Sequence, residues 1–250
     1  MIDIHTHLLP AVDDGSPSIE VSVRVLEQFR RDGVSRVVCT PHLEASQIPR
    51  RPLALHRERL AALEAASAEL PALSLGCELM LDAPGLPIED PSLGLGGSRA
   101  LLVEFSRLGV PPQGGAELAR LAREGWVPVL AHPERYRGCT VDQVRAWRES
   151  GVVIQTDAKL LLASGPAATL AISLLESGLI DILASDNHGD DRSQRAVVTW
   201  LASLGGEKHA ELLTRENPER LLGNRALIPV PPLRGVLGIK DRIGRLFSRR

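Results

Sequence analysis

Short apolar runs recur along the chain and alternate with stretches in which apolar residues are spaced as on one face of a helix. Each run is almost continuously apolar or β-branched, which is typical of parallel strands buried on both faces. The predicted strands are residues 2–4, 36–39, 73–77, 101–105, 127–131, 152–156 and 180–184. The predicted helices are residues 19–31, 53–70, 116–123, 141–149 and 167–176. This alternation predicts an α/β fold with right-handed crossovers.

The predicted strands could form either a closed barrel or an open doubly wound sheet. No Gly-rich dinucleotide fingerprint follows the first strand. Residues of metal-ligating type lie just past the C-terminal ends of nearly all the strands, and barrel enzymes assemble their sites at that face. We therefore expect a TIM-like barrel with a metal site at the C-terminal mouth of its strands.

The distribution of proline, glycine and basic residues also predicts how the chain is divided into domain, linker and tail. Residues 82–99 are rich in Pro and Gly and are expected to form a loop without regular structure. No domain boundary is marked before about residue 225, so residues 1–228 are predicted to be the barrel. Pro-Val-Pro-Pro at 229–232 is expected to be a stiff linker that holds the tail off the barrel. The tail up to residue 250 is basic and amphipathic, and could attach to anionic lipid or to a membrane-bound kinase.

Composition narrows the classes of function. The 250 residues suffice for one substantial core or at most two small domains. Aromatic residues make up only 3% of the chain and the net charge is −2, which argues against nucleic-acid binding. There is no signal-peptide pattern and no apolar run long enough to span a membrane. The three cysteines show no spacing pattern, so we expect reduced thiols in a cytoplasmic protein.

Imidazole and carboxylate side chains at the strand ends would meet at the mouth of a barrel. The candidate metal ligands are His5, His7, His42, Glu78, Glu104, His132, Asp186 and His188. Asp14 could simply form a turn before Gly15, but we prefer it as a further ligand. This mixture suits several borderline divalent ions, with manganese expected and iron or zinc as alternatives. His56 and His209 lie outside the pattern and are interpreted as structural or solvated residues.

At these motifs the chain resembles the PHP (polymerase and histidinol phosphatase) superfamily. Within it, the sequence is similar to the bacterial protein-tyrosine phosphatases of capsule and exopolysaccharide operons, the CpsB/YwqE type. The resemblance runs from residue 1 to about 225 and rests on MIDIHTHLLP at 1–10, VDDG at 12–15, TPH at 40–42, GCE at 76–78, AHPERY at 131–136, ASDNH at 184–188 and ENP at 216–218.

The resemblance implies a distorted (β/α)7 barrel that holds three metal ions. Asp14 and the eight residues above fall on the family's ligand positions, and Arg135 falls on an arginine that contacts phosphate. Arg192 is a candidate second phosphate contact, although its spacing from His188 requires an adjustment of one residue. The implied reaction is attack of a metal-activated water on phosphotyrosine carried by the tail of a bacterial tyrosine kinase that controls capsule or exopolysaccharide synthesis.

Some positions depart from these patterns or leave alternatives open. Asp157 stands where the family usually has Asn, and could disturb the surroundings of the site or add a ligand. Cys139 and Arg145 match the Cys-x5-Arg spacing of cysteine-dependent phosphatases, but the segment lacks an internal glycine, and Thr140 and Gln143 instead predict a helix capping box. Alternative functions are a PHP phosphatase of a small histidinol-phosphate-like phosphomonoester, a nuclease, and a non-catalytic regulator that binds a phosphopeptide.

Overall fold

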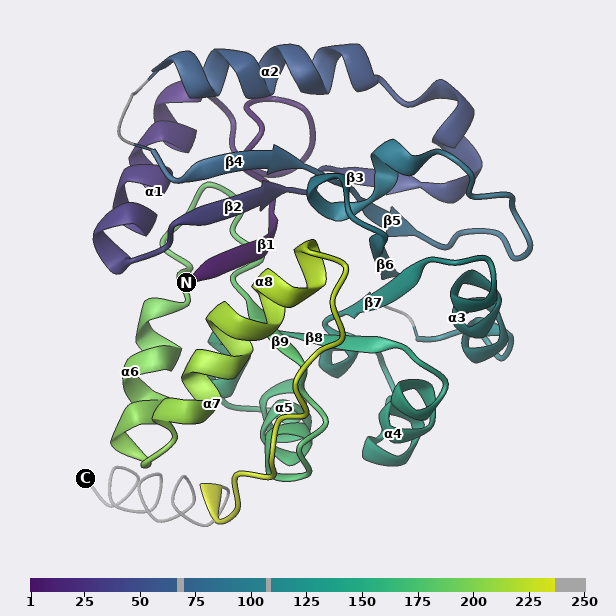
Figure 1. Cartoon of the computed structure of the whole chain (residues 1–250), viewed down its shortest axis with the longest axis vertical. Coiled ribbons are helices and arrows are strands. Elements are labelled where there is room, and N and C mark those ends of the chain that lie inside the picture. Colours follow the sequence, from purple (N-terminus) through teal and green to yellow (C-terminus); the bar gives the residue numbers. More distant parts are fainter. Residues whose placement is uncertain (67–69, 107–108, 237–250) are drawn as a thin grey trace.

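All the strands of the structure run parallel, and their spatial order follows the chain. The computed structural model describes residues 1–66, 70–106 and 109–236 (Figure 1). β1, β2 and β4 form one sheet, and β3, β5, β6, β7, β8 and β9 form another. The strands are β1 (Ile2–Thr6), β2 (Arg36–Cys39), β3 (His42–Glu44), β4 (Ala72–Leu75), β5 (Glu78–Met80), β6 (Ala100–Glu104), β7 (Val127–Ala131), β8 (Val153–Asp157) and β9 (Ile182–Ala184). The predicted α/β class is confirmed.

The two sheets are consecutive parts of one barrel-like wall. The chain continues from β2 into β3 through Thr40 and Pro41, and from β4 into β5 through residues 76–77, so two of the strand positions are interrupted. On the other side, the amide of His7 donates to the carbonyl of Asn187 (2.8 Å), and the amide of Asp186 donates to the carbonyl of His5 (3.0 Å). The segment after β9 therefore lies beside β1, and the last strand position returns to the first.

Helices cover the outside of the strands. The predicted helices correspond to α1 (Ile19–Asp32), α2 (Leu53–Ala66), α3 (Gly114–Arg123), α4 (Val141–Glu149) and α5 (Pro166–Glu176). The end predicted for the second of these, at residues 67–69, lies outside the described residues. Three further helices were not predicted in full: α6 (Arg195–Ser203), α7 (Glu207–Glu211) and α8 (Asn217–Leu222). Residues 82–99 are mostly irregular, as expected, but contain two 3-10 turns, Pro91–Leu93 and Leu95–Gly97.

Local signals explain where several helices begin and end. Ser18 caps α1 by accepting from the amide of Val21, and Gly33 ends the helix in the left-handed region at φ 90°. Thr140 and Gln143 form the predicted capping box at the start of α4. The segment around Cys139 is therefore a helix entrance, which confirms that it is not built as a phosphate-binding loop.

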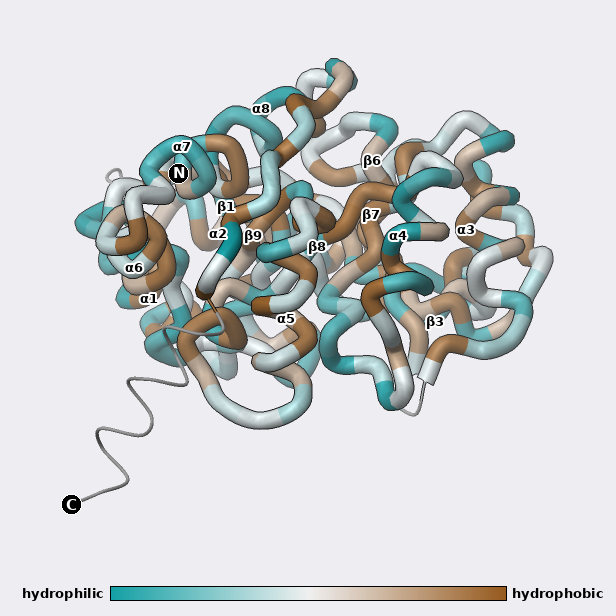
Figure 2. The backbone as a smooth tube through the Cα atoms, turned by 90° about the horizontal axis from the view of Figure 1, so that it is seen from below, coloured by the Kyte–Doolittle hydropathy of each residue, from teal (hydrophilic) through white to brown (hydrophobic). Residues whose placement is uncertain are grey.

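The core has two layers, one inside the strands and one between strands and helices. The inner cluster takes one or two residues from each of β1, β2, β6, β7, β8 and β9, including Ile4, Val38, Leu102, Val129 and Ile182. Figure 2 shows hydrophobic positions along the central strands and hydrophilic ones along α7 and α8. Because the inner cluster fills the barrel, the functional groups are confined to its ends.

The chain after α8 packs against the barrel, which corrects the expected linker. Val230 is only 4% exposed, and its neighbour Pro231 accepts a hydrogen bond from His209 Nε2 (3.0 Å). The amide of Leu233 donates to the carbonyl of Leu175 in α5 (3.3 Å). Residues 229–236 thus lie on the barrel surface rather than holding a tail away from it, because Val230 and Val236 are buried there. The predicted amphipathic tail begins at Leu233, and its residues 237–250 lie outside the described residues.

Candidate metal centre

All nine predicted metal ligands meet at the C-terminal mouth of the strands. His5 lies in β1 and His7 just after it, while His42 and Glu78 begin β3 and β5. Glu104 ends β6. The other four lie in loops: Asp14 before α1, His132 after β7, and Asp186 and His188 after β9. The interruptions of the second and third strand positions place His42 and Glu78 beside each other, paired in register.

The innermost group consists of His5, His7, Glu78 and Asp186, all at most 1% exposed. The Nε2 atoms of the two histidines are 3.2 Å apart. Glu78 Oε2 lies 3.2 Å from each Nε2, and Asp186 Oδ1 lies 3.2 Å from His5 and 3.3 Å from His7. Ligand atoms at these separations fit around one ion with bonds of roughly 2.0–2.1 Å, the range for zinc-nitrogen contacts.

Two further groups adjoin the first and share residues with it. In the outer group, Asp14 Oδ1 lies 3.3 Å from His42 Nε2 and 3.6 Å from His188 Nε2. In the third group, Glu78 Oε2 is 3.1 Å from His42 Nδ1, and Glu104 Oε1 is 3.5 Å from the same nitrogen. His132 Nε2 is 2.8 Å from the other oxygen of Glu78. Glu78 therefore contacts four of the candidate ligands, His5, His7, His42 and His132, as a bridging carboxylate would.

Hydrogen bonds at Nδ1 fix the orientation of three histidines. His5 Nδ1 lies 2.9 Å from Gln155 Oε1, and His7 Nδ1 lies 2.8 Å from Asp13 Oδ2. His188 Nδ1 lies 2.9 Å from the backbone carbonyl of Asp186. Each acceptor requires an N–H on Nδ1, which leaves the Nε2 lone pair directed into the site. The sequence did not identify Gln155 or Asp13 in this role, although a Gln inside the buried strand β8 is an unusual residue that could have served as a signal.

The charges of the group fit bound cations. Burial lowers the pKa of His7, but hydrogen bonds to Asp13, Asp186 and Glu78 outweigh this and raise that pKa well above its ordinary value. The same opposition of burial and carboxylate contacts raises the pKa of His42 to about 10. The pKa values of Glu78 and Asp186 are lowered despite burial, because histidines surround both carboxylates. Without metal, the carboxylates are thus balanced by protonated imidazoles. Divalent ions would replace the protons on these imidazoles.

Backbone strain occurs at two of the ligands. His132 has φ 36° and Asp186 has φ 49°, in the left-handed region that residues other than glycine rarely adopt. Such conformations persist where the surrounding structure forces them, and they concentrate at functional sites.

Both predicted arginines reach the edge of the metal centre. Arg135 Nη2 lies 2.6 Å from Asp186 Oδ2 and also forms an ion pair with Asp157. Arg192 Nη1 lies 3.5 Å from the same Asp186 oxygen, while its Nε pairs with Asp190 at 2.6 Å. Asp186 therefore faces the histidines with one oxygen and the arginines with the other. Asp157 is fully buried and contacts Arg135 and the amide of Lys159 (3.0 Å), so it adds no ligand to the groups above.

A parallel barrel-like fold with a multinuclear histidine and carboxylate site at its mouth defines the class of metal-dependent hydrolases. Comparison with protein families matches residues 1–223 to the family described as "Capsular polysaccharide synthesis, CpsB/CapC". The chain belongs to this family.

Named relatives and solved structures agree with this assignment. The chain is 27% identical to tyrosine-protein phosphatase YwqE of Bacillus subtilis, over 93% of this chain and 95% of that protein. It is 27% identical to tyrosine-protein phosphatase CpsB of Streptococcus pneumoniae, over 89% and 98% of the two chains. A crystal structure from a study of these two "unique metal-dependent tyrosine phosphatases" superposes with a TM-score of 0.80 at 25% identity, covering 93% of this chain and 98% of the other. The phosphotriesterase homology protein of Escherichia coli shares the fold alone, with a TM-score of 0.56 at 12% identity over 88% and 98% of the chains.

Proposed function

We propose that this protein is a metal-dependent protein-tyrosine phosphatase acting on a bacterial tyrosine kinase that controls capsule or exopolysaccharide synthesis. The observation that carries the proposal is the convergence of the nine candidate ligands with two arginines that meet on Asp186. The names of the relatives support the same activity and the same biological setting.

We assign two or three divalent ions to the three ligand groups, with manganese expected and iron or zinc as alternatives. The donor set of imidazole nitrogens and carboxylate oxygens suits all three metals. When bound, such ions lower the pKa of a coordinated water and polarise phosphoryl oxygens. Gln155 and Asp13 hold His5 and His7 in the tautomer that presents Nε2, so the protein supplies a preorganised set of lone pairs.

The arginines supply the recognition of the phosphoryl group. A phosphomonoester carries about two negative charges near neutral pH, and a guanidinium can contact its oxygens in a bidentate manner. Arg135 contacts carboxylates through Nη2, which is held by Asp157 and Asp186. Its remaining donors are available for substrate. Arg192 is assigned as the second contact with the phosphoryl group. Its side chain is 15% exposed, and its Nη1 lies 3.5 Å from the same oxygen of Asp186.

None of the cysteines is suited to act as the nucleophile. Cys39 and Cys77 are fully buried, and burial raises the pKa of each to about 12. Burial raises the pKa of Cys139 to about 11, so its thiolate is scarce at neutral pH. Attack by water, rather than by a thiolate, is the reaction that these residues favour.

The proposed partner is the phosphotyrosine-bearing tail of the kinase, met on the cytoplasmic side of the membrane. Among the described residues, no helix combines the length and apolar character needed to cross a bilayer. Attachment of the basic tail after Pro232 to anionic lipid or to the kinase stays a prediction. Removing the tail is expected to leave peptide turnover unchanged and to weaken salt-sensitive sedimentation with anionic vesicles.

Phosphate release tests the substrate class. We expect the metal-loaded protein to release phosphate from a phosphotyrosine peptide faster than from histidinol phosphate, and not to cleave a phosphodiester. Preference for the small phosphomonoester or the diester would favour the alternative phosphatase or the nuclease. Tight peptide binding without phosphate release would favour the regulatory module.

A further inference from the structure

One cavity lies at the opposite end of the barrel from the metal centre. It has a volume of about 650 Å³ and adjoins a second of about 350 Å³, and the two share Arg99, Gly125 and Trp126. Arg99 immediately precedes β6, and Gly125 and Trp126 immediately precede β7. The cavity is therefore at the N-terminal ends of the strands, where the proposed phosphatase chemistry makes no use of it.

One wall of the cavity is an irregular loop that side chains from other elements hold in place. The indole Nε1 of Trp126 donates to the carbonyl of Ile88 (2.8 Å). Arg120 of α3 donates to the carbonyl of Leu86 (3.0 Å), and Arg51 donates to the carbonyl of Ser92 (3.0 Å). Because these three hydrogen bonds hold the loop, this wall of the cavity is preformed. Long irregular loops in compact domains are often functional.

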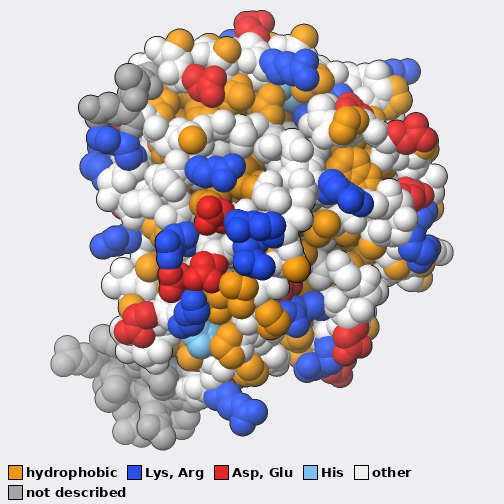
Figure 3. All heavy atoms as spheres, in the orientation of Figure 1, with side chains coloured by type: hydrophobic (Ala, Val, Ile, Leu, Met, Phe, Trp, Pro, Cys, Tyr) orange, Lys and Arg blue, Asp and Glu red, His pale blue; other side chains and the backbone are white. Residues whose placement is uncertain are grey.

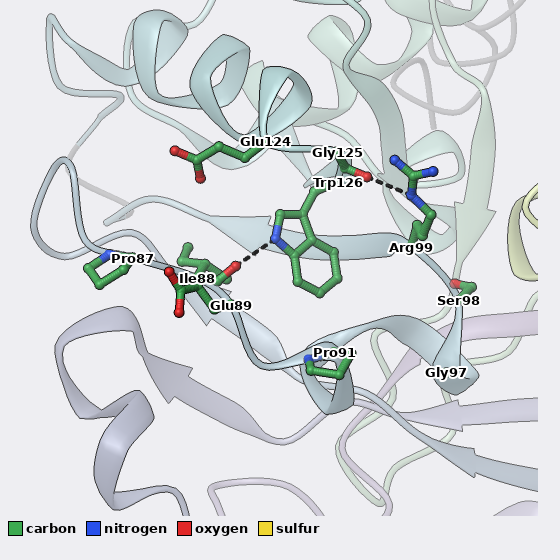
Figure 4. Close-up of a pocket in the computed structure, with 10 residues that line it drawn as sticks. All are labelled: Pro87, Ile88, Glu89, Pro91, Gly97, Ser98, Arg99, Glu124, Gly125 and Trp126. Atoms are coloured by element: carbon green, nitrogen blue, oxygen red, sulfur yellow. Dashed lines mark hydrogen bonds between the residues drawn. The ribbon is translucent and has the colours of Figure 1, made fainter.

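Trp126 offers the face of its ring, but not its N–H, to a ligand. Figure 4 shows the indole projecting into the cavity, between Arg99 on one side and Ile88 and Pro91 on the other. Its N–H is already satisfied by Ile88, so recognition of a peptide carbonyl by the indole is excluded. A flat ring stacked on the free face is the contact that remains.

The charge at the cavity favours an anion at the arginine end. Arg99 donates from Nε to the carbonyl of Gly125 (2.7 Å) and, within the described residues, forms no ion pair. Arg225, which lines the adjoining cavity, likewise forms none there. Of the two lining acids, Glu124 is paired with Arg120 (2.5 Å), which leaves Glu89 as the opposing charge. Lys and Arg side chains are prominent over the middle of the face that carries α8, mixed with Asp and Glu (Figure 3).

We propose that this cavity is a second ligand site, which binds a planar aromatic anion. The ring stacks on Trp126 and the anionic group pairs with Arg99. β6 and β7 run from the cavity towards the metal centre: Glu104 ends β6, and His132 directly follows β7. The span is five residues in each strand, or roughly 16 Å at about 3.3 Å per residue.

Binding is tested by titrating the full-length protein with AMP and, separately, with benzoate, which distinguish phosphate-bearing from carboxylate-bearing rings. Adenosine serves as the uncharged probe. We expect at least one of the two anions to quench tryptophan fluorescence and adenosine to bind more weakly. Arg99→Ala should lower the affinity roughly tenfold or more, about 1.4 kcal/mol. Glu89→Gln should raise it.

Matched variants keep the result interpretable. Arg123 is an exposed arginine of α3 outside the cavity lining, so Arg123→Ala should bind as the wild type does. Trp126→Leu should lose binding, which is measured here by calorimetry. If that variant fails to fold, the Arg99 and Glu89 variants still test the site, because they leave the indole in place. Absence of binding by both anions, or equal binding by the wild type and Arg99→Ala, would overturn the site.

Discussion

Replacing Arg135 by alanine should separate substrate recognition from metal binding. Arg135 contacts Asp186 on the side opposite the histidines, so its removal leaves the ligand atoms in place. A lost charge contact to the transition state typically lowers turnover by roughly 100-fold or more, about 2.7 kcal/mol. We therefore expect phosphotyrosine-peptide turnover to fall by that factor, while metal content measured by elemental analysis stays that of the wild type.

The same substitution should also lower stability, because it leaves Asp157 buried without its cation. Breaking a buried ion pair on one side costs about 3–5 kcal/mol, and Asp157 keeps the amide of Lys159, so we expect about 3 kcal/mol. For a chain of this size that corresponds to a melting temperature lower by roughly 6–12 °C. Adding Asp157→Asn to Arg135→Ala should recover part of this loss without recovering turnover.

A second arginine provides the control. Arg148 donates to Asp181 from Nε (3.0 Å) and Nη2 (2.9 Å), away from the mouth of the strands. Arg148→Ala should lower the melting temperature and leave turnover per folded molecule unchanged. The reasoning is refuted if Arg135→Ala turns over peptide as the wild type does, or if Arg148→Ala reduces turnover equally.

Three further predictions concern individual residues in and around the site. His132→Ala should lose metal as well as activity, whereas His209→Ala, which alters only a contact with a backbone carbonyl, should lose neither. Asp13→Asn should weaken metal affinity by roughly 10–100-fold in a chelator competition, because Asp13 fixes the tautomer of His7; unchanged affinity would remove that role. Burial raises the pKa of Glu134 from 4.5 to about 8, so the unfolded chain loses this proton first and stability falls as pH rises between those values. Glu134→Gln should therefore gain stability relative to the wild type as pH rises from about 5 to 8 in denaturant titrations, and a constant difference would contradict the assignment.

The ligand positions could be predicted because strand ends are visible in the sequence. A buried parallel strand is a local apolar run, and the residue after it must lie at the mouth whatever the details of packing. His5 and His132, which directly follow predicted strands, could be assigned on this basis alone. The interruption at Pro41 and Gly76 was not predicted, although proline cannot donate to the ladder and glycine weakens a strand interior. The structure places Gly76 where a Cβ would lie 2.8 Å from a methyl carbon of Leu95.

The supporting residues could not be predicted, because their contacts join distant parts of the chain. Gln155 and His5 are separated by 150 positions, and no local pattern relates a glutamine in β8 to a histidine in β1. The helices after residue 190 were missed for a related reason. α7 and α8 are short, and a π-helical turn, Leu212–Glu216, joins them, so no single helical periodicity covers the segment. The burial of Val230 likewise depends on tertiary packing that the Pro-rich composition does not reveal.

The central claim is that metal ions held by the nine ligands, rather than a cysteine, drive phosphate release from phosphotyrosine. The most direct measurement compares phosphate release from a phosphotyrosine peptide by three preparations: protein stripped with chelator, the same protein reloaded with manganese, and reloaded protein alkylated at Cys139. We predict no release by the stripped protein, recovery on reloading, and full activity after alkylation. Release that survives exhaustive chelation but is abolished by alkylation of Cys139 would contradict the account.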